Sequence, residues 1–351
     1  MHQIQASERA RPCRSRVDNW NGRSSRLLLG LLAILAATTP AAAKLDYPMR
    51  AITVIVPFAA GGPTDIVARI VTAHMAKTFR QQIMIENVVG AGGTTAASRA
   101  MRAAPDGYTL LIGHMGTHGN AVAVYPQLAY DPVKDFAPIG LVIEMPSLVL
   151  ARADLPAQNL GDLARYLNNH SKLTTMAHAG IGSVSYATCT LLNSIIDAHP
   201  ATKAYQGTGP ALQALMAGHV DYMCDQIVSA FPRIKSGDVK ALAIVSPRRS
   251  PVLPDVPTAT EAGIGNFAIT AWNALFAPKG TPRELIDRLN AALGRALDDP
   301  DVRKELTDLG SEVPSVEERS PAELAKRVES EVARWTPSSK PPPVGGERVA
   351  Q

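Results

Sequence analysis

The stretch ITVIVPFAAGGPTDIVARIVTAHMAKTF, residues 52–79, decides the fold expected of this chain. It begins with an unbroken apolar run, Ile52–Val56, which ends at a proline and suits a strand buried on both faces. Two glycines and Pro63 follow, and proline is favoured in the first turn of a helix. Apolar residues then recur at helical spacing as far as Phe79. The stretch therefore predicts a strand, a glycine turn and a helix.

The glycine turn is a candidate anion-binding site. Because Gly61 and Gly62 have no side chains, a ligand can approach their backbone closely. The unpaired N–H groups and the positive end of the helix dipole attract carboxylates and phosphates. Asp65, in the first turn of the helix, either balances this dipole or orients a ligand hydroxyl. Many such turns bind nothing, so this turn alone does not establish a site.

The length and charge of the chain limit its function classes. With 351 residues, 46% of them hydrophobic and 19% charged, the chain is typical of a globular protein of two domains. The net charge of +4 comes from residues 1–43, which hold six arginines and two acidic residues. Removing these from 35 basic and 31 acidic residues leaves 29 of each. A neutral chain gives no general electrostatic case for nucleic-acid binding.

Residues 1–43 are typical of a secretory signal peptide with an N-terminal extension. Arg23 and Arg26 precede the apolar run LLLGLLAILAA, and three alanines ending at Ala43 suit cleavage. The apolar run is short for a membrane span. We therefore expect the mature protein to be exported to the periplasm. Of the three cysteines, only Cys189 and Cys224 would remain, and nothing in the sequence requires that they pair.

After residue 44, strand-like and helix-like segments alternate. The predicted strands are 52–56, 82–88, 108–113, 141–151, 173–178, 202–205, 222–225, 239–246 and 271–277. The predicted helices are 63–79, 94–103, 120–125, 160–168, a segment from 184 to 192, 211–216, 282–297, 302–309 and 321–335. This alternation favours two α/β domains with parallel sheets, joined near residues 144–148.

Four glycine turns recur between a predicted strand and a predicted helix. They are Ala59–Asp65, Gly90–Thr95, Gly180–Ser185 and Gln206–Pro210. In open α/β sheets ligands bind outside the strand carboxyl ends, where these four helix starts could converge. None of the turns is a nucleotide-binding signature, and we expect no cofactor. Asp225 and the adjacent Gln226, at a strand end, are as ambiguous as Asp65.

Catalytic motifs are weak in this sequence. The histidines show no metal-ligand spacing, and no GxSxG nucleophile elbow is present. Ser183, Ser185 and His178 are close in sequence, but a serine near a histidine is usually coincidence. We therefore expect neither a metal site nor catalytic activity.

Six ordered motifs resemble the Bug receptors, the extracytoplasmic solute-binding proteins of tripartite tricarboxylate transporters. These motifs are VPFAAGGPTD (56–65), ENVVGAGGTTAA (86–97), PDGYTLL (105–111), YDPVKDFAPI (130–139), YQGTGPALQALMAGHVDYMCDQ (205–226) and LPDVPTATEAG (253–263). The resemblance covers residues 46–335. It implies a type II periplasmic-binding-protein fold, with two α/β lobes, a hinge and a ligand cleft. Residues 46–147 with 268–336 would form lobe 1 and residues 148–267 lobe 2. Residues 337–351, which are rich in Pro, Ser and Gly, are expected from their composition to be a disordered tail.

The resemblance also implies which residues contact the ligand. Members of the family hold a small carboxylate through backbone N–H groups and hydroxyls. The matching positions are Phe58, Gly61, Gly62, Asp65, Gly92, Gly93, Thr117, Gly182, Ser183, Gln206, Gly207, Thr208 and Asp225. Thr117 belongs to a strand-end loop that varies with the ligand.

The expected function is that of a monomeric periplasmic receptor for a small organic acid. The receptor would deliver its ligand to the permease subunits of a tripartite tricarboxylate transporter. One alternative is a ligand sensor that acts on a sensor kinase, and another is a periplasmic enzyme that acts on a small acid. Dicarboxylates, citrate-like acids, aromatic acids and neutral analogues such as nicotinamide all remain open as ligands.

Overall fold

The computed structural model describes residues 46–265 and 267–336. The described residues from Tyr47 onward belong to one compact unit. The expected signal peptide at residues 1–43 and the expected disordered tail at residues 337–351 lie outside the described residues. Within the described ranges, no helix is both long enough and apolar enough to span a membrane.

The stretch that opened the sequence analysis folds as predicted. β1 (Ile52–Val56) is a mostly buried strand, and α2 (Pro63–Phe79) begins at its proline. The N-cap residue is Gly62, which has no side chain to bond the first N–H groups. Helix α2 ends at Arg80, which takes a left-handed backbone conformation.

The remaining elements complete an α/β chain with a long central strand. The other strands are β2 (Ile83–Asn87), β3 (Thr109–His114), β4 (Phe136–Arg152), β5 (Thr175–His178), β6 (Ala201–Ala204), β7 (Tyr222–Gln226), β8 (Val239–Val245) and β9 (Thr270–Pro278). The other helices are α3 (Thr94–Met101), α4 (Ala121–Val124), α5 (Leu160–His170), α6 (Val184–Ile195), α7 (Thr208–Met216), α8 (Ile227–Lys235), α9 (Arg283–Asp298), α10 (Pro300–Asp308) and α11 (Pro321–Trp335). A short π-helical segment, η2 (Gly116–Asn120), precedes α4.

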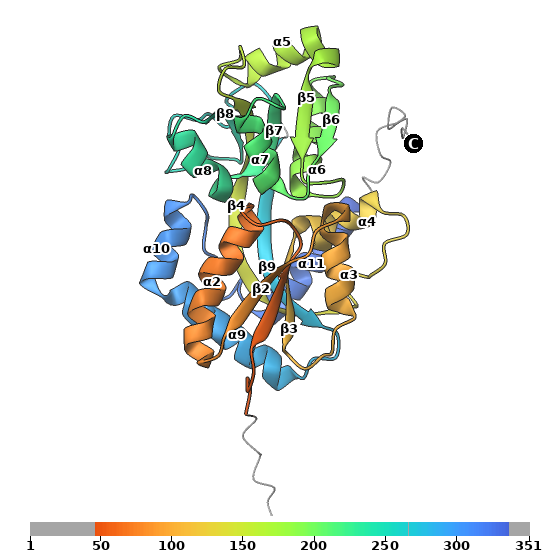
Figure 1. The fold of residues 1–351 in the computed structure, drawn as a ribbon, viewed down its shortest axis with the longest axis vertical. Helices are drawn as coiled ribbons and strands as arrows, with labels where there is room; N and C mark the ends of the chain where they lie inside the picture. The colour runs from red at the N-terminus through yellow and green to blue at the C-terminus, as the bar shows by residue number, and fades with distance from the viewer. Residues whose placement is uncertain (1–45, 266, 337–351) are drawn as a thin grey trace, which may run out of the picture. The chain divides into compact units, whose positions relative to one another are not determined.

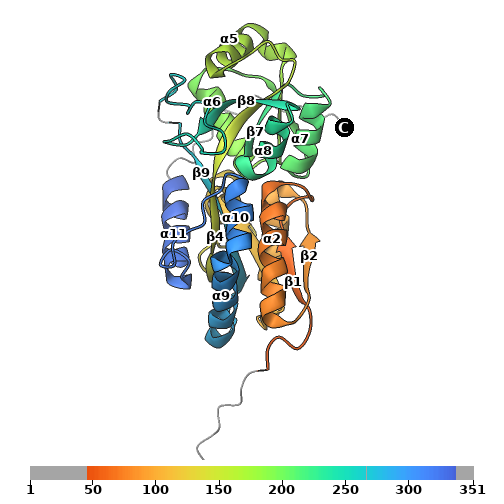
Figure 2. The same cartoon turned by 90° about the vertical axis from the view of Figure 1, so that its left-hand side faces the viewer.

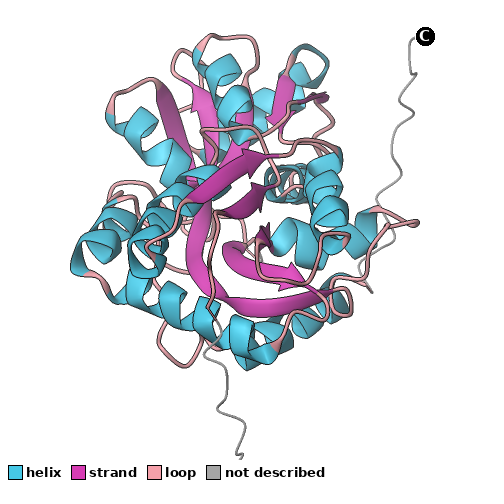
Figure 3. Cartoon of the chain, turned by 60° about the horizontal axis from the view of Figure 1, so that its bottom comes forward, coloured by secondary structure: helices cyan, strands magenta, loops and turns pink. Residues whose placement is uncertain are grey.

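The strands of the described residues form a single curved sheet flanked by helices (Figure 3). Its strand order is β2-β1-β3-β9-β4-β7-β5-β6, and β8 pairs with the edge of β4 opposite β7. β1 pairs in parallel with β2 and β3, and β5 pairs in parallel with β6 and β7. β9 is antiparallel to β3 and β4, and β4 is antiparallel to β7 and β8.

The expectation of parallel sheets was therefore wrong for the centre of the molecule. β4 passes through the region where a junction between domains was expected, so the chain crosses there as a continuous strand (Figure 1). β9 runs back beside it in the opposite direction. An alternating pattern in the sequence predicts which segments are strands. It does not predict whether two strands more than 100 residues apart, such as β4 and β9, pair in parallel or antiparallel. Helix α8 was also not predicted, because its Pro232 is usually a helix breaker.

Two halves of this unit are distinguished by their strand pairing. The first half consists of β1–β3, β9, residues Phe136–Pro146 of β4, and helices α2–α4 and α9–α11. The second half consists of residues Ser147–Arg152 of β4, β5–β8 and helices α5–α8. The three C-terminal helices pack on the first half, with α9 and α10 against α2 and α11 against β4 (Figure 2).

A disulfide crosslinks the second half. Cys189 of α6 and Cys224 of β7 are both buried, their Cα atoms are 5.5 Å apart, and their sulfur atoms are bonded. This answers the question of pairing that the sequence left open. The disulfide fixes the helix that begins after Ser183 against the strand that contains Asp225.

Candidate functional site

The first and fourth glycine turns meet at the boundary between the halves. The backbone N–H of Ala59 donates to the carbonyl oxygen of Gln206 at 2.8 Å. A Cβ atom added to Gly209 would lie 2.7 Å from the carbonyl oxygen of Ala60, and one added to Gly62 would lie 3.2 Å from the Thr208 hydroxyl. Side chains at these glycines would therefore push the two turns apart.

The second and third glycine turns make a similar contact. A Cβ atom on Gly92 would lie 2.0 Å from the carbonyl oxygen of Ile181, which no rearrangement of a side chain could relieve. The backbone of Gly92 also has a positive φ of 60°, which favours glycine. The turns predicted from the sequence thus converge in two pairs, each joining one half to the other.

Two hydrogen bonds reinforce this second contact. The side-chain amide of Asn120 donates to the carbonyl oxygen of Gly182 at 3.3 Å, and the Tyr125 hydroxyl donates to that of Ile181 at 2.6 Å. Asn120 ends the π-helical segment η2, and Tyr125 follows α4. Neither residue was identified from the sequence, because no local pattern marks a side chain that reaches another part of the fold.

A cavity of about 20 Å³ lies where the turns converge, with room for about one water molecule. Its lining residues are Phe58, Gly62, Pro63, Thr64, Asp65, Ala179, Ser183, Val184, Ser185, Thr208 and Gln226. These residues come from both halves, so the cavity lies between them.

The starts of four helices contribute to the cavity. The N-cap residues of α2, α6, α7 and α8 are Gly62, Ser183, Gly207 and Gln226. Ser183 accepts a hydrogen bond from the N–H of Tyr186, whereas α2 and α7 have no side-chain cap. Uncapped N–H groups and helix dipoles favour an anion at such a place. No lysine or arginine is among the described residues that line the cavity.

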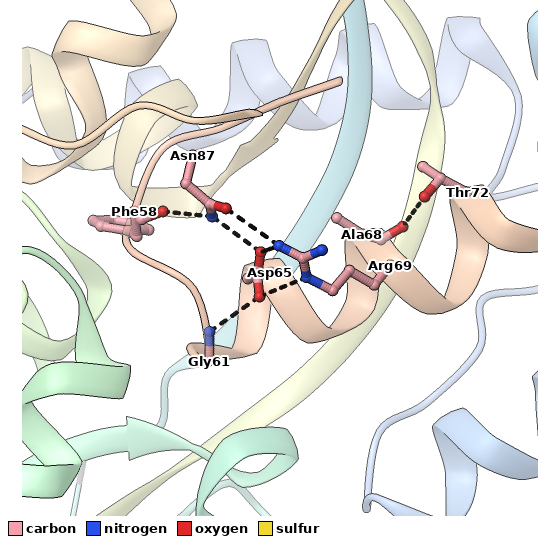
Figure 4. A network of polar contacts seen from close by, with 7 residues as sticks. All are labelled: Phe58, Gly61, Asp65, Ala68, Arg69, Thr72 and Asn87. Carbon is pink, nitrogen blue, oxygen red and sulfur yellow. Dashed lines mark hydrogen bonds and ion pairs between the residues drawn. The ribbon is translucent and has the colours of Figure 1, made fainter. Parts of the chain in front are cut away.

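Asp65 holds the first turn in position (Figure 4). Its carboxylate accepts hydrogen bonds from the Gly61 N–H at 3.0 Å and the Asn87 amide at 2.9 Å, and Arg69 donates to both oxygens at 2.9 Å. Burial alone would raise the pKa of Asp65, but the hydrogen bonds from Arg69, Gly61 and Asn87 and the Arg69 charge hold it below its usual value. The contacts of Asp65 support a role that was not expected from the sequence, namely holding the first turn in position through Gly61, Arg69 and Asn87.

Asp225 has different surroundings in the second half. It is fully buried, accepts hydrogen bonds from the Ser229 hydroxyl at 2.7 Å and the Gln226 N–H at 2.9 Å, and has no cationic partner among the described residues. Burial raises the pKa of Asp225 to about 6, although hydrogen bonds from Ser229 and Gln226 and the nearby Thr208 hydroxyl oppose the increase. Asp225 does not line the cavity, whereas the next residue of the chain, Gln226, does.

Thr117 is not among the residues that line the cavity. Its hydroxyl is 2.9 Å from Nδ1 of His118 and within hydrogen-bonding distance of the backbone of His114, so it faces its own loop. Its methyl group would touch a Cβ atom on Gly93 at 3.0 Å. Thr117 therefore supports the second glycine turn and does not face the cavity in this structure.

The structure brings most of the predicted site residues to one place. Five of them line the cavity, namely Phe58, Gly62, Asp65, Ser183 and Thr208. Gly61, Gly92, Gly93, Gly182, Gln206 and Gly207 lie in the glycine turns, and Thr117 and Asp225 are not lining residues. Gln226 is a lining residue that the sequence left ambiguous, although its place at the end of an apolar strand was a usable signal.

The serines and the histidine considered for catalysis do not form a catalytic pair. Nδ1 of His178 accepts a hydrogen bond from the Gly180 N–H, and burial lowers the pKa of His178 to about 4. The Ser185 hydroxyl accepts from the Ala179 N–H and is 3.1 Å from the Ser183 hydroxyl. Within residues 46–265 and 267–336, no hydrogen bond joins His178 to either serine, and no cluster of acidic, His or Cys side chains could hold a metal ion.

Comparison with known proteins gives consistent matches. The model of the tripartite tricarboxylate transporter family receptor matches residues 67–340. A UPF0065 protein from the TAR-I ttuE-ttuC' intergenic region of Agrobacterium vitis is 39% identical over 311 residues, covering 89% of this chain and 90% of the relative. MatC of Rhodopseudomonas palustris, solved with bound malate, is 55% identical with a TM-score of 0.82, covering 84% of this chain and 100% of MatC. The periplasmic binding protein BugD is 40% identical with a TM-score of 0.80, covering 82% of this chain and 96% of BugD.

Proposed function

The chain belongs to the receptor family of the tripartite tricarboxylate transporters, and from this premise we propose that it is a periplasmic receptor that captures a small carboxylate between two lobes. Its mixed sheet and flanking helices form the α/β fold of periplasmic binding proteins. The observation that supports the proposal best is the convergence of glycine turns from both halves on one cavity.

The two halves would act as the two lobes, with residues 46–147 and 268–336 in one and residues 148–267 in the other. β4 and β9 cross between them near Pro146 and Thr270 and would serve as the hinge. A ligand that accepts hydrogen bonds from both lobes binds the closed arrangement more tightly than the open one. Ligand binding therefore shifts the population of the receptor toward the closed arrangement. The contacts between the turns described above would belong to such a closed arrangement.

The ligand would contact the expected residues that line the cavity or lie in its glycine turns, with a carboxylate held at the starts of α2, α6 and α7. Thr117 and Asp225, which do not line the cavity, would support these residues from neighbouring positions. Neutral donors suit this task because several N–H groups and hydroxyls stabilise an anion without a cationic side chain. That MatC was solved with malate supports a small organic acid as the ligand class.

A signal peptide at residues 1–43 would deliver the receptor to the periplasm, where it would act as a monomer. Permease subunits of a tripartite tricarboxylate transporter would receive the ligand from the closed form. The role is binding without turnover, and the separation of His178 from the neighbouring serines is consistent with it.

The proposal is tested by measuring the thermal stability of residues 44–336 with a panel of organic acids and amides. A ligand that binds the folded state raises the melting temperature in proportion to the logarithm of its concentration above Kd. Gly62→Asp should abolish this increase, because it adds bulk and negative charge between α2 and Thr208. Gly294→Asp is the matched control, since a Cβ atom there meets no neighbour within 4 Å. If no acid raises the melting temperature, the receptor function is refuted.

A further inference from the structure

The carboxyl group of Asp225 is buried and has no cationic partner among the described residues. Asp225 is the second-last residue of β7, and the last residue, Gln226, lines the cavity. Burial raises the pKa of Asp225 to about 6, so the charge of this group changes close to neutral pH. The proposed ligand is an anion, and an ionised carboxyl group near an anion disfavours its binding.

The sheet separates Asp225 from the histidine of the neighbouring strand. Cys224 is bonded to Cys189 of α6, and successive side chains of a strand point to opposite faces, so Asp225 points away from α6. The ring of His178 on β5 lies 4.9 Å from the ring of Tyr186 on α6, between their centroids. His178 therefore belongs to the α6 face of the sheet and does not face Asp225.

The other elements packed around Asp225 also present no free charge to it. Helix α7 contains no acidic or basic residue, and the basic residues of α8, Arg233 and Lys235, lie in its last turn. Asp65 of α2 is paired with Arg69. The charged residues of β4 are paired as well, namely Glu144 with Arg327, and Arg152 with Asp154 and Asp221. The charge of Asp225 therefore responds mainly to its own hydrogen bonds and to an anion in the cavity.

The hydroxyl of Thr208 connects Asp225 to the cavity. Thr208 lines the cavity at the start of α7, and its hydroxyl is close enough to Asp225 to lower the pKa of the carboxyl group. This hydroxyl is buried and makes no formed hydrogen bond to any described residue, so its single proton is uncommitted. An ionised Asp225 and a ligand carboxylate would both need this proton, and only one of them can accept it.

We propose that Asp225 is a positioning residue that takes up a proton from solvent when the receptor binds a carboxylate. The protonated Asp225 donates its hydrogen to the Thr208 oxygen, and the Thr208 hydroxyl donates its own hydrogen to the ligand. Loss of the negative charge on Asp225 also removes its repulsion of the ligand. This inference rests on the receptor function proposed above and adds one proton to the binding reaction.

The test is a count of the protons bound together with the ligand. Calorimetric titrations with malate and with adipate, in two buffers of different ionisation enthalpy, give this number and the Kd. The acids themselves are ionised at pH 7, because ordinary carboxyl groups titrate near about pH 4. If the ligand raises the pKa of Asp225 by one unit, about 0.4 proton is taken up at pH 7, and Kd is about 5-fold higher at pH 8 than at pH 6.

Asp225→Asn separates this role from a structural one. Its amide still donates to the Thr208 oxygen but binds no proton, so the variant resembles the protonated state. It should bind both acids without proton uptake and, at pH 8, about 10-fold more tightly than the unaltered protein. Asp287→Asn is the control, because this exposed residue of α9 undergoes the same chemical change and should leave the proton count unchanged.

Variants of Thr208 test the connection. Thr208→Val removes the hydroxyl, so it should weaken binding of both acids and reduce the pH dependence of Kd. Thr208→Ser keeps a hydroxyl at the same position and should retain the affinity and the pH dependence of the unaltered protein.

The possible results separate the failure of this inference from the failure of the receptor function. Binding without proton uptake, with the same Kd at pH 6 and pH 8, refutes the role of Asp225 and leaves the receptor function intact. Proton uptake that persists in Asp225→Asn belongs to another group and also refutes it. Weaker binding by Asp225→Asn at both pH values shows a purely structural residue, which refutes it as well. If neither acid binds to the unaltered protein at either pH, the receptor function fails and this inference fails with it.

Discussion

Asp65 in the first half and Asp225 in the second are both buried next to the cavity, yet the pKa values of their carboxyl groups are shifted in opposite directions. Asp65 has Arg69 as an ionic partner and stays charged. Asp225 has only hydroxyl and backbone donors among the described residues, so burial dominates and raises its pKa. The comparison shows that the partner, and not burial alone, decides whether a buried carboxylate remains ionised.

The halves also differ in how they fix the elements that carry their turns. The first half uses the ionic network of Asp65, Arg69 and Asn87, whereas the second uses the disulfide between Cys189 and Cys224. A covalent link acts mainly by restricting the unfolded chain, while an ionic network acts in the folded state. The predictions below test this difference, beginning with the largest expected effect.

Replacing both cysteines, Cys189→Ala with Cys224→Ala, should lower the free energy of unfolding by about 3 kcal/mol, because the disulfide closes a loop of intermediate length. Urea denaturation of the oxidised protein and the double variant measures the difference. A reducing agent added to the unfolding experiment should destabilise the unaltered protein and leave the double variant unchanged. Equal free energies of unfolding for the oxidised unaltered protein and the double variant would contradict the prediction.

Asp65→Asn should lower the free energy of unfolding by about 2 kcal/mol, because hydrogen bonds to a charged group are lost from the turn. The expected loss is reduced because the Arg69 side chain is 52% exposed and regains water. Asp287→Asn is the matched control, since the exposed Arg283–Asp287 pair has the same i,i+4 spacing and should contribute at most about 0.5 kcal/mol. Equal losses in the two variants would show that the network adds nothing beyond a surface ion pair.

Asp225→Asn should remove a pH dependence of stability whose sign is opposite to that of Asp65. A carboxyl whose folded pKa is raised contributes stability below its unfolded pKa, and this stability is lost as pH rises through about 6. The unaltered protein should thus lose about 1 kcal/mol relative to the variant between about pH 5 and pH 7. Asp65, whose pKa is lowered, contributes stability that is lost as pH falls.

Urea denaturation of both proteins at each pH gives this difference directly. Contributions from other groups, such as His178, are shared by the two proteins and cancel when the free energies are subtracted. A difference that stays constant from pH 5 to pH 7 would show that Asp225 does not titrate in this range.

Tyr125→Phe should have the smallest effect, about 0.5–1 kcal/mol, because it removes one hydrogen bond between the halves. Tyr166→Phe is the control, since the Tyr166 hydroxyl makes no hydrogen bond to the described residues. Tyr125→Phe should also weaken ligand binding, since that bond joins the halves only when the turns meet. An unchanged Kd would show that the bond does not contribute to closure.

The first half of the fold was predicted more accurately than the centre of the sheet. β1 and α2 were expected at their observed bounds because an apolar run, a proline and a helical repeat are local signals. The directions of β4 and β9 were not, because their pairing depends on residues such as Leu141 and Ala274 that are far apart in the chain. Helix α8 forms despite Pro232 because its apolar residues are buried.

The candidate site also contains residues that the sequence predicted and residues whose role depends on distant contacts. Gly62 was expected from turn chemistry, whereas Ser183 and Thr208 were expected from the family resemblance, and all three lie at the cavity. The role of Asp65 depends in part on Asn87, which is 22 residues away and gives no sequence signal. The sequence could not predict that Nε2 of Gln226 has no hydrogen-bond partner among the described residues. This property depends on which acceptor atoms the fold brings close to the amide.

The pairing of Pro146 with Thr270 makes the second half an insertion between two neighbouring strands. At that position β4 and β9 are adjacent and antiparallel, which is the geometry that a two-residue β-hairpin loop connects. A truncated gene that replaces residues 147–269 with such a loop would therefore preserve the pairing of β4 with β9. The receptor could in this way be reduced to a minimal single-domain scaffold whose two termini both lie outside the excised segment.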